Sequence, residues 1–191
     1  MAGRSSGLPQ TPGERLTGSR LAIKNARILL TSAEALAANR AYGVANSLLI
    51  ESAEEAVKAG LLAAAGLGSK DAQKNLSAAF VGHKHKHMQG LIPHLPDIAA
   101  KWIKVLKSTP PKDLPRPGSP AVGFDPEGIF TWWAHAEVTR VAGFYVDFRD
   151  GRWQTPEDIT AEDYAHSRRI VTGELVEAER QQAELADAVK S

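Results

Sequence analysis

The chain has 191 residues, of which 23 are basic and 22 acidic, and it carries a formal net charge of +1. This length suffices for one well-packed domain without disulfides or a structural metal, and the near-zero charge excludes a strong global field that would attract nucleic acid or membranes. The absence of cysteine excludes a disulfide framework, a thiolate zinc site and a cysteine nucleophile, and it fits a cytoplasmic location. No apolar run is long enough for a membrane-spanning helix.

The N-terminal segment 1–15 is expected to be a disordered tail, because it is rich in Gly, Ser and Pro and lacks the apolar core of a secretory signal. One helical-bundle domain is then expected over residues 16–190. Periodic apolar residues predict a first helix over 16–39, with Thr17 or Ser19 as its N-cap. A second helix is predicted over 41–67, where glycines provide a C-cap signal.

The second predicted helix carries a charged cluster within a sequence that is otherwise apolar or small. Its members are Glu51, Glu54, Glu55 and Lys58, whose spacing places them on one helix face. Glu54 can pair with Lys58 there, whereas Glu51 and Glu55 repel each other. A cation or hydrogen-bond donor from another segment is therefore expected beside the glutamates.

A third helix is predicted from residue 70 to about residue 88, where the chain carries histidines alternating with lysines. If the second and third helices form an antiparallel hairpin that turns at residues 67–68, His83 lies level with about residue 52. We therefore expect His83 to face the glutamates of the second helix.

Three interpretations of the histidine–lysine segment remain open. His83 and His87 share a helix face and could bind zinc together with a glutamate of the second helix. Alternatively, Lys84 and Lys86 could contact phosphate while His83 acts as a general acid or base. The third possibility is that the segment is a solvated basic helix end.

The middle of the chain is expected to contain a short amphipathic helix over 97–107 and then a proline-rich extended loop over 108–125. Asp125 provides an N-cap signal for a further helix that ends near residue 142. We expect five aromatic residues to pack in the core or within a hairpin, namely Trp132 and Trp133 on this helix and Tyr145, Phe148 and Trp153 after it.

Alternating residues on both sides of Asp150-Gly151 predict a β-hairpin near residues 144–154, and this hairpin should lean on the bundle. Arg149 and Arg152 lie beside aromatic residues there and could contact nucleic acid. A last helix is predicted from Thr160 to about residue 189, with one apolar seam for packing against the bundle or a second copy. The predicted fold class is therefore all-α, an up-and-down helical bundle with one small β-hairpin.

Three motifs, in this order, resemble the AbiV family of bacterial abortive-infection proteins over residues 20–175. They are Leu48-Leu49-Ile50 followed by Glu54-Glu55-x-x-Lys58-Ala59, then His83-Lys84-x-Lys86, and then Tyr145-Val146-Asp147-Phe148 followed by Gly151-x-Trp153-x-x-Pro156.

The resemblance implies a HEPN-like bundle that forms a homodimer and defends bacteria against phage by arresting growth or translation. It also implies RNA or a ribosome-associated target as partner and a phage protein as possible trigger, with no membrane, metal or cofactor. The implied site has a polar centre and a set of RNA contacts. The centre consists of Glu54, Glu55, Lys58 and His83 as catalytic residues, and the RNA contacts are Lys84, Lys86 and Arg149.

Two activities are compatible with this resemblance. HEPN proteins are often metal-independent ribonucleases that use an Arg-x4-6-His motif, but none of the six histidines in this chain follows an arginine at that spacing. The alternative is a non-catalytic interaction module that binds a phage or ribosomal protein. In that case the Glu, Lys and His residues form a structural polar network that sets helix register.

Overall fold

The computed structural model of the protein describes residues 7–81, 86–87, 89–90, 128–149 and 151–190. The predicted helix over 97–107, the proline-rich loop over 108–125 and the N-cap at Asp125 lie outside these residues. Within the described part of the chain, no helix is long and apolar enough to cross a membrane.

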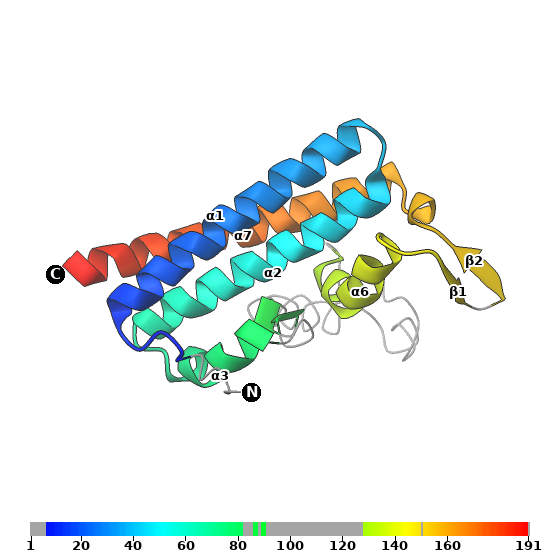
Figure 1. Cartoon of the computed structure of the whole chain (residues 1–191). Coiled ribbons are helices and arrows are strands. Elements are labelled where there is room, and N and C mark those ends of the chain that lie inside the picture. Colours follow the sequence, from blue (N-terminus) through cyan, green and yellow to red (C-terminus); the bar gives the residue numbers. More distant parts are fainter. Residues whose placement is uncertain (1–6, 82–85, 88, 91–127, 150, 191) are drawn as a thin grey trace, which may run out of the picture.

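Three long helices form the body of the molecule (Figure 1). They are α1 (Pro12–Ala38), α2 (Tyr42–Gly66) and α7 (Ala161–Lys190). A tight connection joins α1 to α2, and the two helices pack side by side in opposite directions. The C-terminal α7 covers both helices and runs in the same direction as α2.

Two shorter helices pack on the remaining side of α2, namely α3 (Lys70–Val81) and α6 (Ile129–Ala142). The chain then forms a two-stranded sheet of β1 (Asp147–Arg149) and β2 (Arg152–Gln154), followed by the short 3-10 helix η3 (Pro156–Asp158). The prediction of an all-α fold with one small hairpin is thus confirmed.

The central position of α2 follows from its sequence. Its small and apolar residues are buried on several sides, and Leu49, Ile50 and Ala53 are fully inaccessible to solvent. Two buried hydroxyl groups lock α2 to α1, since Ser52 Oγ donates to the carbonyl of Ala26 at 2.8 Å and Ser19 Oγ donates to that of Ala59 at 3.0 Å. A polar group that α2 carries inside this core is therefore costly unless it finds a partner in the protein.

The first helix begins earlier than predicted. Thr11 is its N-cap, Pro12 is its first residue, and a reciprocal capping box joins Thr11 to Glu14. In this capping box Glu14 N–H donates to Thr11 Oγ1 at 3.2 Å, while Glu14 Oε2 accepts from Thr11 N–H at 3.0 Å. The capping box satisfies N–H groups that lack partners in the first turn, so residues 12–15, which were predicted to belong to the tail, are helical.

The start of α6 also differs from the prediction. This helix begins at Ile129, after Gly128, whose φ of +71° lies in the left-handed region that favours glycine. No side chain caps this N-terminus among the described residues. The turn at Gly128 therefore marks where the helix begins.

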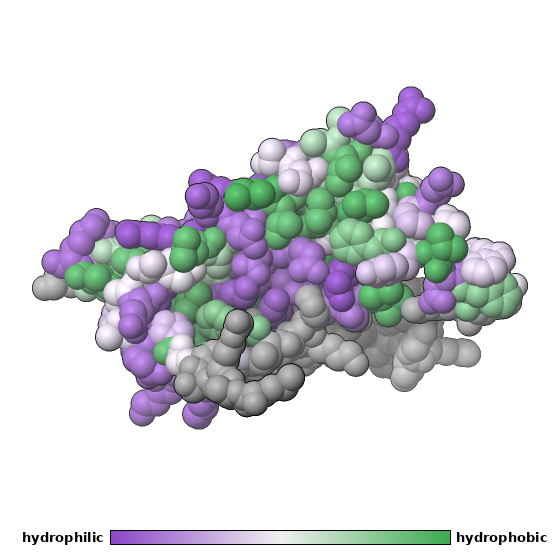
Figure 2. Space-filling model, in the orientation of Figure 1, coloured by the Kyte–Doolittle hydropathy of each residue, from purple (hydrophilic) through white to green (hydrophobic). Residues whose placement is uncertain are grey.

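The hairpin has the predicted position, and two of its aromatic residues pack on each other within it. Phe148 and Trp153 are cross-strand partners whose rings meet edge to face at 5.2 Å, and Gly151 in the turn has a φ of +76°. However, Trp153 is 67% exposed and Tyr145 is 64% exposed, so these aromatic residues do not pack in the core. Figure 1 shows the hairpin projecting from the end of the bundle, and Figure 2 shows hydrophobic residues at the surface there.

Candidate functional site

A buried carboxylate, Glu54, lies at the centre of the candidate site. The side chain projects from the middle of α2 and is fully inaccessible to solvent. Its Oε2 accepts a hydrogen bond from Lys86 Nζ at 2.9 Å, and its Oε1 lies 2.9 Å from Nε2 of His87. Lys86 is 8% exposed and His87 is 7% exposed, so a carboxylate, an ammonium group and an imidazole share one buried site.

The three side chains compensate one another electrostatically. A buried carboxylate without a partner is strongly unfavourable, and the Lys86 ammonium group supplies both an opposite charge and a hydrogen bond. An ionised carboxylate can only accept hydrogen bonds, so Nε2 of His87 is the nitrogen that carries the hydrogen in this contact. We refer to Glu54, Lys86 and His87 together as the buried triad.

The side chain of Trp133 on α6 packs against the buried triad. The ring of Trp133 lies 5.7 Å from the ring of His87, centroid to centroid, and Trp133 is only 1% exposed. Trp133 Nε1 donates to Glu174 Oε1 at 3.2 Å and so links the site to α7. Gly90 lies directly against this indole, because a Cβ at that position would come within 2.3 Å of the ring.

The other charged residues of the α2 cluster have separate partners. Lys58 forms an ion pair with Glu55, and its ammonium group also lies 5.8 Å from the centre of the Phe80 ring. The expected pairing of Lys58 with Glu54 is therefore wrong. In an α-helix a lysine side chain can reach residues three or four positions away, and here the buried Glu54 is already bound to Lys86.

Glu51 obtains its compensating cation from α6. Arg140 Nη1 lies 3.3 Å from Glu51 Oε1, and Arg140 also forms an ion pair with Glu137 at 3.0 Å. The hydrogen bonds that Arg140 donates to Glu137 raise the pKa of Arg140 above its ordinary value, although burial acts in the opposite direction. The predicted repulsion between Glu51 and Glu55 is thus offset by two separate cations, Arg140 and Lys58.

The predicted site residues fall into three groups. Glu54 lies in the buried triad, whereas Glu55 and Lys58 form the neighbouring ion pair. Lys86 was predicted to contact RNA, but its ammonium group is buried against Glu54. His83 and Lys84 lie outside the described residues, as does the side chain of Arg149, whose backbone pairs with that of Arg152 in the hairpin.

Three residues of the site were not predicted in these roles, namely His87, Trp133 and Arg140. His83 is expected beside the glutamates but lies outside the described residues. The structure brings His87, about one helical turn further along the chain, to Glu54. Trp133 and Arg140 depend on how α6 packs against α2, for which the sequence has no local signal.

The described residues do not favour a metal centre. No group of three or more His, Cys, Asp or Glu side chains that could hold a metal ion occurs among them. In addition, the Lys86 ammonium group occupies one face of the Glu54 carboxylate, where it would repel a cation. The predicted zinc pair of His83 and His87 involves a residue outside the described part of the chain.

The chain was compared with known proteins in three ways. No match was found among curated proteins or among solved structures. A protein-family model, HEPN AbiV, described as AbiV, matches residues 14–177, which is most of the chain. This match covers all of α2, the buried triad, α6 and the hairpin. The chain therefore belongs to the AbiV family of HEPN proteins.

Proposed function

We propose that this protein is an antiphage effector that arrests the growth of infected bacteria by acting on RNA or on the translation machinery. Membership of the AbiV family supports a role in abortive infection. The proposal includes a cytoplasmic homodimer as the working form and a phage protein as the trigger.

We further propose that the buried triad is a structural network and not a catalytic centre. The observation that carries this proposal is that Glu54 is fully buried while both of its carboxylate oxygens are engaged by Lys86 and His87. A substrate as large as RNA has no access to such a group in this conformation. A hydrogen-bonded buried network of this kind fixes the position of one chain segment on another.

The second candidate function is a metal-independent ribonuclease. The contact between Glu54 and His87 favours it, because a carboxylate that orients an imidazole is a recurrent arrangement in general acid–base catalysis. In this candidate His87 transfers a proton, and the predicted residues Glu55, Lys58 and His83 assist at the same centre. The buried triad would have to open before RNA could reach His87.

Infection of cells that express the protein tests the proposed function. Phage titre, protein synthesis by pulse labelling and the integrity of total RNA are measured over the infection cycle, with an empty vector as control. We expect a lower phage titre and a halt in protein synthesis with intact RNA. RNA fragments that disappear in His87→Gln would favour the ribonuclease, whereas equal titres with and without the protein would contradict both candidates.

A further inference from the structure

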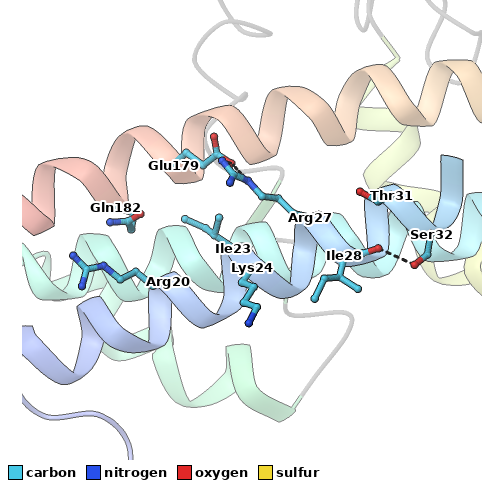
Figure 3. Close-up of a pocket in the computed structure, with 9 residues that line it drawn as sticks. All are labelled: Arg20, Ile23, Lys24, Arg27, Ile28, Thr31, Ser32, Glu179 and Gln182. Atoms are coloured by element: carbon cyan, nitrogen blue, oxygen red, sulfur yellow. Dashed lines mark hydrogen bonds and ion pairs between the residues drawn. The ribbon is translucent and has the colours of Figure 1, made fainter. Parts of the chain in front are cut away.

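An open groove runs between α1 and α7, away from the buried triad. Its volume is about 620 Å³. Figure 3 shows Arg20 and Gln182 at one end of this groove and Thr31 and Ser32 at the other end. Along α1 the distance from residue 20 to residue 32 corresponds to about 18 Å. The groove is therefore long enough to hold an extended ligand.

Unpaired positive charge is the main property of this groove. Arg20 and Lys24 are exposed, lie one helical turn apart, and form no ion pair within the described residues. Glu179 is the one carboxylate among the described lining residues, and it is neutralised by Arg27 at 2.7 Å.

Some of the other cations on the two long helices have carboxylate partners, whereas exposed Arg169 on α7 forms no ion pair within the described residues. Arg168 pairs with Glu34 across α1 and α7, while Arg180 and Lys190 pair with carboxylates on α7 itself. Among the described lining residues, Arg20 and Lys24 thus leave the groove with a net positive charge, and a ligand that uses this charge must be an anion.

We propose that the groove between α1 and α7 binds the sugar–phosphate backbone of single-stranded RNA, which rests on the proposed function that the protein acts on RNA. Arg20 and Lys24 contact phosphates, because guanidinium and ammonium groups form charge-assisted hydrogen bonds to phosphate oxygens. Ile28, which is exposed, supplies apolar surface for sugars and base faces, and Thr31 supplies a hydroxyl group. The combination of unpaired cations and apolar surface in an open channel suits a flexible strand.

Measurements of RNA binding with neutralised lysine and arginine side chains test this proposal. Fluorescence anisotropy is recorded with a fluorescein-labelled single-stranded RNA of about 16 nucleotides at several salt concentrations. The test variant is Arg20→Gln/Lys24→Gln. The matched control is Lys70→Gln/Lys74→Gln, which removes two exposed lysines at the same spacing on α3. Circular dichroism verifies that both variants are folded.

We expect the groove variant to bind RNA at least about tenfold more weakly than the control. The slope of log Kd against log salt concentration should fall by about 1.4, because each lost phosphate contact with a single strand removes about 0.7. Equal affinity and an equal slope in the groove variant and the wild type would overturn the proposal. That result would leave the RNA-acting effector intact if the wild type binds RNA.

Two further outcomes test the assignment of the groove to RNA. Polyglutamate of the same charge should not displace the labelled RNA, and displacement at equal charge concentration would overturn the assignment to RNA. Failure of the wild-type protein to bind RNA at all would overturn the groove proposal and direct action on RNA together. The role in phage defence is measured independently by phage titre.

Discussion

Nε2 of His87 lies 2.9 Å from Oε1 of Glu54, although 33 residues separate the two in the sequence. Together with the ion pair from Lys86, this contact fastens the chain beyond α3 to the middle of α2. Trp133 of α6 packs against the same imidazole and is hydrogen-bonded to α7. Three separate parts of the chain therefore meet near one buried carboxylate. Loss of this carboxylate should destabilise the whole bundle.

Replacement of Glu54 by glutamine should destabilise the protein by about 3 kcal/mol, because it leaves the Lys86 ammonium group buried without a countercharge. Chemical denaturation followed by circular dichroism measures this free energy. The control is Glu34→Gln, which removes an exposed ion pair with Arg168 and should cost less than about 1 kcal/mol. Similar losses of stability in both variants would contradict this account, because the buried Lys86 ammonium group would then not need the charge of Glu54.

Two glycine substitutions should have opposite effects on stability. At Gly90 a Cβ would come within 2.3 Å of the Trp133 ring, so Gly90→Ala should cost about 1–3 kcal/mol through overpacking. At Gly173, inside α7, a Cβ would meet nothing within 4 Å, and Gly173→Ala should stabilise by up to about 1 kcal/mol. Thermal melting measures both, and a stable Gly90→Ala variant would contradict the close contact with Trp133.

The tryptophans should divide into a structural and a surface class. Trp133 is 1% exposed, so Trp133→Ala should cost about 3–5 kcal/mol. Trp153 is 67% exposed on the projecting hairpin, and Trp153→Ala should change the free energy of unfolding by less than about 0.5 kcal/mol. Urea unfolding of the two variants provides the comparison. A large loss of stability in Trp153→Ala would contradict the exposed position of that side chain.

Acid should fray the start of α1. Backbone hydrogen bonds from Thr11 and Gln10 lower the pKa of Glu14 below its ordinary value of 4.5. The folded pKa is therefore below the unfolded one, so the contribution of Glu14 is complete above pH 4.5 and is lost as the pH falls through the folded pKa. Protection of the amides of residues 13–15 against hydrogen exchange, relative to their intrinsic exchange rates, should fall in that range, and Glu14→Gln should show no such pH dependence.

The positions of the long helices could be predicted from the sequence because their signals are local. Each signal lies within or directly beside the element that it defines. The signals are the apolar periodicity of the helices, the glycines at the end of α2 and the Asp-Gly pair between β1 and β2. The start of α1 was misplaced because the capping box of Thr11 and Glu14 occurs within a segment whose composition resembles a tail. Local composition and local capping disagree there, and capping prevails.

The partners of the charged residues could be predicted only in part. The need for a cation beside the glutamates followed from their spacing, and Lys86 and Arg140 meet that need. Their identity depends on the rotation and tilt of the neighbouring helices, which the sequence pattern does not specify. The same limitation explains why the sequence does not decide whether Trp153 packs in the core or within the hairpin, where its ring meets that of Phe148.

The most direct test of the structural role of the buried triad replaces all three polar side chains by apolar ones of similar size, in the variant Glu54→Leu/Lys86→Met/His87→Leu. Well-packed apolar residues often replace a buried ion pair without loss of stability. Phage titre is measured in cells that express this variant, and circular dichroism verifies its fold. The account predicts a folded protein that still lowers the phage titre as the wild type does. A folded variant that no longer protects the cells would contradict it and assign catalysis to the buried triad.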